Sequence, residues 1–208
     1  MMARIASVEE LRRILPNPRP STMAKILTEL DEQATAFVQK CPFVLLSTVD
    51  EAGVIEVSPK GDEPGFVRVE DSRTLLMPER AGNNLAFGLQ NIIANGRVAL
   101  IFLVPQTGET LRVTGSAEIL DDADVVARLG SKNRPALLGI RIHVARCYFH
   151  CARAILRSQI WQPASWPAPG KISFGRVIAP RIGADEKVAG EIDARVEAAY
   201  TTNLWSNR

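Results

Sequence analysis

Apolar and polar residues alternate along several short stretches between residues 43 and 149 of this 208-residue chain. Side chains on a β-strand point to opposite faces in turn, so a period of two is typical of strands with one buried face. The pattern is clearest over residues 109–120, where the apolar positions are Leu111, Val113, Ala117 and Ile119. Residues 98–104 are apolar throughout, which predicts a strand buried on both faces. Strands are predicted over residues 43–49, 54–58, 66–69, 73–77, 98–104, 109–120 and 139–149.

A period near 3.6 residues indicates helices elsewhere in the chain. The first, over residues 7–15, begins with Ser7 and has Glu10 three residues later, which together form a capping box. A second helix is predicted from Ser21 or Thr22 to about Lys40, with apolar residues along one side. Further helices are predicted over residues 85–95, 121–130, 152–160 and 185–200.

Short strands joined by tight turns, with few helices between them, favour an antiparallel sheet over a parallel one. The sequence has no Gly-x-Gly-x-x-Gly after a strand and no P-loop, so the usual dinucleotide and nucleoside triphosphate folds lack their motifs. We therefore predict a mainly β (α+β) fold, a barrel of about six to seven antiparallel strands with flanking helices. Three regions are expected: 1–40, a helical segment packing on the barrel; 41–162, the barrel core; and 163–208, a Pro-rich stretch and a C-terminal helix.

The stretch from Glu56 to Asn95 carries the main functional signal. Its first half is a strand whose polar face continues into Lys60. Pro59 cannot donate a ladder hydrogen bond and Gly61 tolerates unusual dihedral angles, so the strand is predicted to break where Lys60 emerges.

The second half of this stretch repeats the arrangement. Pro78 is predicted to end a strand, and a short loop then leads into the helix over residues 85–95. A helix N-terminus offers free backbone N–H groups and positive potential, which favour an anion. Lys60 supplies a point charge, Arg80 a planar pair of donors, and the neighbouring amides further donors. These groups predict one phosphate pocket, formed by Lys60, Arg80, Asn83 and Asn84.

Net charge and hydropathy limit the possible partners. The formal charge of +2 is too small to indicate nucleic acid or an anionic membrane as a partner. The sequence has no apolar run of membrane-spanning length and no signal-peptide core, so we expect a cytoplasmic protein without a membrane partner. The three cysteines are an odd number, which fits a reducing compartment.

A group of histidines and cysteines after residue 142 resembles a metal site at first sight. On a helix, His143, Cys147, His150 and Cys151 would share one face. Residues 139–149 alternate between apolar and polar positions, however, so a strand is predicted and the shared face is lost. We expect no metal site.

Four sequence blocks, taken in order, carry a resemblance to a known family. The blocks are S-P-K-G-D-E-P-G-F-V, P-E-R-A-G-N-N, G-E-T-L-R-V-T-G and H-C-A-R-A-I-L-R-S-Q-I-W. They resemble the pyridoxamine 5′-phosphate oxidase-like flavoproteins, and more narrowly a bacterial branch of that family with the same blocks in the same order. The resemblance covers roughly residues 25–170 and implies a split β-barrel homodimer that binds FMN at the subunit interface. It does not identify the substrate.

The resemblance also extends the phosphate pocket to a larger cofactor site. It implies that Arg112 lies on the strand under the cofactor, and that the helix after His150 contributes to the pocket across the dimer. Arg153 stands where relatives are expected to have Lys, which keeps the charge but changes its geometry. The predicted FMN-binding residues are Ser58, Pro59, Lys60, Gly61, Met77, Arg80, Asn83, Asn84, Arg112, His150, Arg153, Arg157 and Ser158.

The chemistry that the resemblance implies is redox chemistry, which the flavin itself supplies. No Ser-His-Asp trio or carboxylate pair indicates hydrolysis, and no catalytic residue is assigned. We expect an FMN-dependent oxidoreductase acting on a small molecule. One alternative is a flavin-binding or sensor protein without turnover. The other is true pyridoxamine 5′-phosphate oxidation, which is disfavoured because the C-terminal region lacks an evident second basic cluster for the substrate phosphate.

Overall fold

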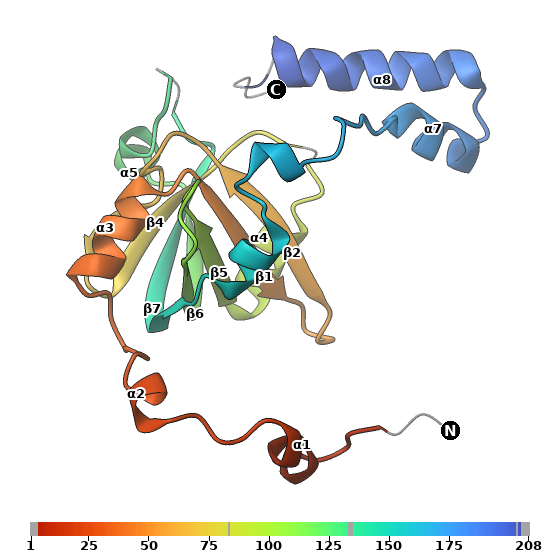
Figure 1. Cartoon of the computed structure of the whole chain (residues 1–208). Helices are drawn as coiled ribbons and strands as arrows, with labels where there is room; N and C mark the ends of the chain where they lie inside the picture. Colours follow the sequence, from red (N-terminus) through yellow and green to blue (C-terminus); the bar gives the residue numbers. More distant parts are fainter. Residues whose placement is uncertain (1–3, 83, 133–134, 203, 205–208) are drawn as a thin grey trace.

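The computed structural model describes residues 4–82, 84–132, 135–202 and 204, and its centre is one antiparallel sheet (Figure 1). The seven strands lie in the order β2-β1-β5-β6-β7-β4-β3, and the sheet curls without closing. Their bounds are β1 Phe43–Val49, β2 Ile55–Gly61, β3 Arg68–Asp71, β4 Thr74–Glu79, β5 Arg97–Leu103, β6 Thr110–Leu120 and β7 Leu138–His150. The predicted split barrel of antiparallel strands with flanking helices is confirmed.

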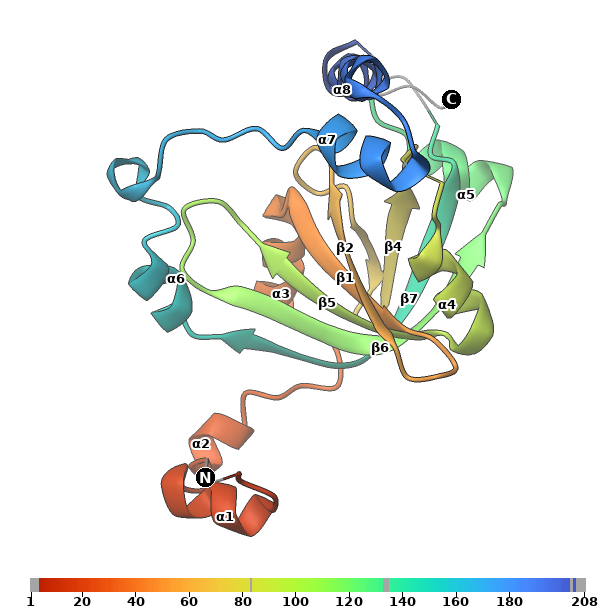
Figure 2. The same ribbon diagram turned by 90° about the vertical axis from the view of Figure 1, so that its right-hand side faces the viewer.

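Helices flank this sheet, and those near the two ends of the chain lie away from it (Figure 2). The helices are α1 Val8–Ile14, α2 Pro20–Met23, α3 Glu32–Lys40, α4 Phe87–Asn95, α5 Ala123–Arg128, α6 Arg153–Ser158, α7 Phe174–Ile178 and α8 Glu186–Thr201, with 3₁₀ turns at Pro163–Ser165 and Ala179–Ile182. Each predicted helix region contains a helix, and α7 was not predicted. Among the described residues, no helix combines the length and the apolar character needed to cross a membrane.

The continuous helix predicted from residue 21 or 22 to residue 40 is wrong. The chain leaves the short α2 and becomes extended at Leu27, whose backbone N–H and C=O both bond to Cys147 on β7, at 2.9 and 2.8 Å. A new helix, α3, then begins after its N-cap residue Asp31. The Asp31 carboxylate accepts a hydrogen bond from the N–H of Ala34 at 2.8 Å. The local apolar period was compatible with one long helix, but pairing with a distant strand divides it.

The hydrophobic core lies on the inner, concave face of the sheet. Its largest fully buried side chains include Leu46, Leu75, Met77, Leu100, Phe102, Leu111, Ile140 and Ile142. The helix α3 adds Ala34 and Val38 to this core, and α4 packs on the same face through Asn91, which donates to Thr48 at 3.0 Å. α3 and α4 therefore cover the inner face.

The outer face of β1, β2 and β5 is apolar but largely uncovered. Phe43, Ile55 and Val57 are 40%, 67% and 57% exposed. Burial alternates along β5, with Ile101 and Leu103 only half-buried on this side, so the prediction that this strand is buried on both faces is wrong. Apolar side chains in this arrangement are typical of an interaction surface.

Two prolines lie inside strands that were predicted to end at them. β2 continues through Pro59 to Gly61, and β4 continues through Pro78 to Glu79. Both are tolerated because one side of each strand is free there: β2 is the last strand of the sheet, and the pairing of β3 with β4 does not extend beyond Leu76.

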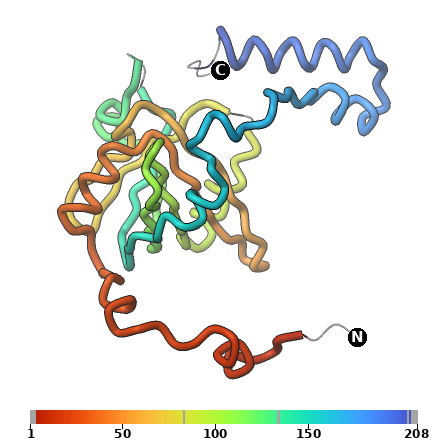
Figure 3. The backbone as a smooth tube through the Cα atoms, in the orientation of Figure 1, coloured from red at the N-terminus to blue at the C-terminus, as the bar shows by residue number. Residues whose placement is uncertain are grey.

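The two ends of the chain extend away from the barrel (Figure 3). α1 and α2 bury no residue. α7 and α8 form a helical hairpin in which the Asp193 carboxylate accepts hydrogen bonds from the Gly175 N–H at 2.8 Å and the Ser173 hydroxyl at 2.5 Å. A Cβ atom on Gly175 would lie 1.9 Å from the Ala189 carbonyl oxygen, so glycine permits the close approach of the two helices.

Candidate functional site

The opening of the barrel is bridged by an ion pair between strands near opposite ends of the sheet. Lys60 on β2 stands opposite the buried Val44, so its side chain lies on the inner face. Its ammonium lies 2.6 and 2.8 Å from the carboxylate oxygens of Glu79 on β4. The two side chains are only 19% and 16% exposed, so this pair is partly shielded from solvent.

A second ion pair lies next to the first. The Nε of Arg80 donates to Asp62 at 2.7 Å, and its Nη2 donates to the Leu129 carbonyl at 2.8 Å. The Asp62 side chain is completely buried and also accepts from the Ser131 hydroxyl at 2.9 Å. Arg80 therefore links its own loop to Asp62, which follows β2, and to Leu129, which follows α5.

Two adjoining cavities, of about 780 and 370 Å³, meet at these ion pairs. Residues that line both are Ser58, Pro59, Lys60, Glu79, Arg80 and Gly82. The larger cavity also contains the exposed pair Lys132 and Glu63, in which a hydrogen bond from Lys132 lowers the pKa of Glu63. The smaller one is lined mainly by apolar residues and by the start of α4.

The N-terminus of α4 faces the smaller cavity. Asn84 and Ala86, just before the helix, have positive φ values of 60° and 54°. The N-cap residue is Ala86, whose methyl group cannot accept a hydrogen bond from the first turn. Gly88 lies close to β1 and β2, where a Cβ atom would be 3.8 Å from the Ser58 hydroxyl. The first turn of α4 thus lies directly beside polar strand residues.

The predicted site residues fall into separate groups. Ser58, Pro59, Lys60, Gly61, Arg80 and Asn84 line the cavities. Met77 is completely buried, so its side chain belongs to the core and not to a cavity wall. Asn83 lies outside the described residues.

Arg112 and His150 lie on the outer face, away from Lys60. Pairing across the sheet places Arg112 in one row with Pro59 and Tyr148, whereas Lys60 belongs to the opposite face. The Nη1 of Arg112 donates to the Tyr148 hydroxyl at 3.4 Å, and Lys25 lies 5.7 Å from the centre of the same ring. Burial lowers the pKa of His150, and the positive charges of Arg112 and Lys25 lower it further.

The remaining predicted residues are on α6. Arg153, Arg157 and Ser158 are all exposed, and the Ser158 hydroxyl donates to the Ile155 carbonyl within the same helix at 3.1 Å. Within one copy of the chain, Lys60 of the cavity group and Arg112 of the outer-face group lie on opposite faces of the sheet.

Residues 139–149 form part of β7, as predicted from their alternation. Within the part of the chain that the structure describes, no three His, Cys, Asp or Glu side chains are arranged to hold a metal ion.

Sequence reasoning missed four residues of these groups: Asp62 and Glu79 beside the cavities, and Lys25 and Tyr148 on the outer face. A signal existed for the two carboxylates, because K-G-D and E-R place an acid within two residues of each predicted cation. No comparable signal existed for Lys25 and Tyr148, which meet only through the tertiary fold.

No curated protein matches this sequence. Among solved structures, HupZ of Group A Streptococcus is similar with 19% identity over 58% of this chain and 93% of that one, at a TM-score of 0.48. A proposed pyridoxamine 5′-phosphate oxidase of Lactobacillus delbrueckii has 24% identity, coverage of 59% and 95%, and a TM-score of 0.46. An FMN-binding protein of Syntrophomonas wolfei has 14% identity, coverage of 57% and 84%, and a TM-score of 0.45.

These structural similarities are too low to establish kinship by themselves. The family model described as pyridoxamine 5′-phosphate oxidase, however, matches residues 30–151, which is more than half of the 208-residue chain and includes all seven strands. The chain therefore belongs to the pyridoxamine 5′-phosphate oxidase family.

Proposed function

We propose that this protein binds FMN in the two cavities at the opening of the barrel and is an FMN-dependent oxidoreductase for a small molecule. The observation that carries the proposal is the position of Lys60 in a chain of this family. Its ammonium lines both cavities, and the first turn of α4 lines the smaller one. A cation beside a helix N-terminus is a suitable environment for a phosphate group.

The residues present fit such a group in two respects. The apolar walls of the smaller cavity, which include Leu46, Phe87 and Leu89, suit an aromatic ring system. The backbone N–H groups at the start of α4 suit a phosphate, since Ala86 cannot cap them with its side chain.

The charge balance shows what binding would require. The described residues lining the larger cavity include three cations and three carboxylates: Lys60, Arg80, Lys132, Asp62, Glu63 and Glu79. A phosphate must therefore compete with Glu79 for Lys60. Arg80 is a weaker candidate, because Asp62 and the Leu129 carbonyl already use two of its nitrogens.

A bound flavin supplies the electron transfer in this proposal. The protein binds and orients it through Lys60, Ser58, Asn84 and the first turn of α4, and the walls of the cavity limit access of water. No residue is assigned to a proton transfer.

A homodimer completes the proposal. The exposed apolar residues Phe43, Ile55 and Val57 on the outer sheet face support a second copy as the partner. In such a dimer, Arg112, His150 and the α6 residues Arg153, Arg157 and Ser158 approach the flavin of the second copy. Val57→Glu is expected to yield monomers in sedimentation velocity, whereas Val8→Glu on the exposed α1 leaves the assembly unchanged. Monomeric wild-type protein would reject the dimer.

The direct test is FMN titration of the purified protein, followed by flavin fluorescence. Tight binding of FMN and weak binding of riboflavin, which lacks the phosphate, are expected. Lys60→Met weakens FMN binding, and Lys187→Met on the surface of α8 serves as the matched control. A wild-type protein that takes up no FMN would reject the proposal.

Turnover separates the enzyme from its alternatives. Steady-state oxidation of a reduced nicotinamide or deazaflavin by the FMN-loaded protein supports an oxidoreductase. FMN binding without turnover of these donors or of pyridoxamine 5′-phosphate supports a flavin-binding or sensor protein.

The three free cysteines support the expected cytoplasmic location.

A further inference from the structure

We propose that the C-terminal arm, residues 171–201 with α7 and α8, packs against a second copy of this chain. Its docking surface on that copy is the β1–β2 tip, residues 50–57. This contact depends on the homodimer proposed above, and not on flavin binding. The arm lies outside residues 30–151, the part of the chain that the family model matches, so the match carries no information on it.

The arm has an apolar face that its own chain leaves uncovered. Phe174, Val177 and Ile178 lie at positions i, i+3 and i+4 of α7, so they share one face of the helix, and all three are exposed. Gly175 lies on the neighbouring face and packs closely on Ala189 of α8. Among the described residues, neither apolar cluster of the barrel core includes a residue of the arm. One face of α7 is therefore left for a partner.

The β1–β2 tip has an uncovered apolar surface of its own. Ile55 and Val57 lie on the outer face of β2, the last strand of the sheet, and Val54 precedes them in the turn. All three side chains are exposed. They continue the outer sheet face that we propose as the dimer surface. Contact between the tip and the arm would remove apolar side chains of both from water.

The arm is positively charged beside its apolar face. Residues 171–182 contain no carboxylate and three cations: Lys171, Arg176 and Arg181. Lys171 and Arg176 contact acids of α8 at exposed positions, where ion pairs contribute little. Arg181 donates to the Val177 carbonyl and forms no ion pair among the described residues. Its charge is available to a partner.

The β1–β2 tip has the opposite charge. Residues 50–57 contain no cation and three carboxylates: Asp50, Glu51 and Glu56. Within the described part of the chain, none of the three forms an ion pair; Asp50 accepts a hydrogen bond from the Val54 N–H at 2.8 Å. Glu56 lies on the other face of β2, so Asp50 and Glu51 are the acids beside the apolar side chains. The arm and the tip are thus complementary in charge, and both are apolar.

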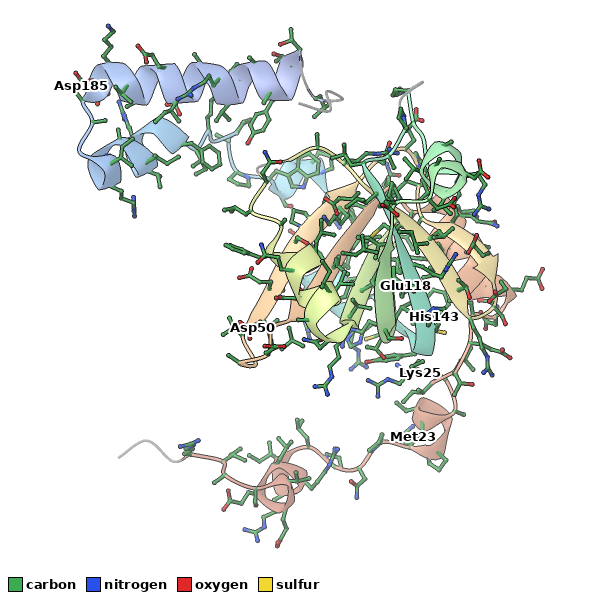
Figure 4. All side chains as sticks on the ribbon, turned by 180° about the vertical axis from the view of Figure 1, so that it is seen from behind. Met23, Lys25, Asp50, Glu118, His143 and Asp185 are labelled. Carbon is green, nitrogen blue, oxygen red and sulfur yellow. The ribbon has the colours of Figure 1, made fainter. Side chains whose placement is uncertain are left out.

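The positions of the two surfaces call for a second copy. Asp185, at the N-cap of α8, and Asp50, in the tip, lie on the same side of the molecule, one at the top and the other low on the barrel (Figure 4). The arm and the tip therefore do not meet within one copy. A two-fold axis between them would reverse top and bottom and bring each arm to the tip of the other copy. The contact would then form twice.

A disulfide between copies tests this contact directly. The full-length double variant Val54→Cys and Val177→Cys is made on a Cys151→Ser background, because Cys151 is the exposed one of the three cysteines. Oxidation with diamide should give a linked dimer on a non-reducing gel, whereas either single variant should remain unlinked. Lys187→Cys with Val54→Cys is the matched control, since Lys187 lies on the side of α8 away from the buried Ala189. As much linked dimer in the control as in the double variant would overturn the proposal.

Charge reversal gives an independent test by sedimentation velocity. Arg181→Glu and Glu51→Arg should each raise the dimer Kd by about tenfold, because two-fold symmetry repeats the lost attraction. The combination of the two should restore the wild-type Kd, and Lys187→Glu, the same charge change elsewhere on the arm, should leave it unchanged. Unchanged Kd values in both single variants, or a further loss in the combination, contradict the contact.

Failure of this contact can be told apart from failure of the proposed function. A dimer that Val57→Glu disrupts but Arg181→Glu and Glu51→Arg leave intact keeps the homodimer and rejects the arm contact. Monomeric wild-type protein rejects both, and its binding to phosphatidylglycerol vesicles would assign the cationic face of α7 to a lipid surface. A linked dimer in a protein that takes up no FMN would reject the flavin function and support the arm contact.

Discussion

The ammonium of Lys60 lies 2.6 Å from the nearer carboxylate oxygen of Glu79, and this contact joins β2 to β4 across the opening of the barrel. The cation that best suits a flavin phosphate is thus engaged by the protein itself. Ligand binding and the closure of the opening become competing uses of one side chain. This competition can be measured.

Glu79→Gln is expected to strengthen FMN binding, because the neutral amide releases Lys60 at lower cost. The gain should be up to about tenfold in Kd, equivalent to about 1.4 kcal/mol. Lys60→Met should have the opposite effect and weaken binding by about 1.5–3 kcal/mol. Fluorescence titration measures both, with Glu118→Gln on β6 as the surface control. Weaker binding by folded Glu79→Gln would contradict the competition.

Arg80→Gln is expected to destabilise the fold and not only the site. The Asp62 side chain is 0% exposed, so removal of its partner leaves a buried charge and should cost about 3–5 kcal/mol in the free energy of unfolding. The exposed pair of Arg13 and Glu9 offers a control, since Arg13→Gln should cost less than about 1 kcal/mol. Urea denaturation followed by circular dichroism gives both values. A cost for Arg80→Gln no larger than that of the control would show that Asp62 remains satisfied.

Gly175→Ala should separate α7 from α8, because its Cβ atom would lie 1.9 Å from the Ala189 carbonyl oxygen. Gly190→Ala, on α8 with nothing within 4 Å of the added atom, should instead stabilise the helix by up to about 1 kcal/mol. Amide hydrogen exchange of α8 separates the two outcomes. Unchanged protection in Gly175→Ala would mean that the two helices do not pack this closely.

The packing of α7 on α8 should also depend on pH. The hydrogen bond from Ser173 lowers the pKa of Asp193, and the N–H of Gly175 lowers it further. A carboxyl with a lowered folded-state pKa contributes stability above its unfolded pKa, and this stability is lost as pH falls through the folded value. Protection of the Gly175 amide should therefore persist at neutral pH and disappear below the usual titration range of aspartate. Asp193→Asn should remove most of this pH dependence, and an unchanged profile in that variant would assign it to another group.

Local patterns predicted the strands well, because alternation reports directly which face of a strand is buried. They failed at Leu27, where a helical period of apolar residues was overridden by backbone pairing with Cys147. The meeting of Lys60 and Arg80 near one opening was also predictable, since each was expected just after a strand and within two residues of a proline. Their pairing with Glu79 and Asp62 was not, because the curl of the whole sheet decides which strand ends approach each other.

The outer-face group, Arg112 and His150, illustrates the same limit of local patterns. Arg112 and His150 were named from sequence blocks, but the blocks carry no information on which face of the sheet each residue occupies. Register does, and it places them on the side opposite Lys60. Lys25 joins them only because the chain turns after α2 instead of continuing as a helix.

Pro59 and Pro78, which lie on the two strands that approach each other at the opening, have a lasting effect on the architecture. Neither residue can offer an N–H at the free edge of its strand. A backbone hydrogen bond between the two strands therefore cannot close the opening at that level. The opening is closed instead by side chains, the ion pair of Lys60 and Glu79. Entry to the interior is therefore reversible by nature, since an ammonium and a carboxylate can part and rejoin while every strand keeps its neighbours.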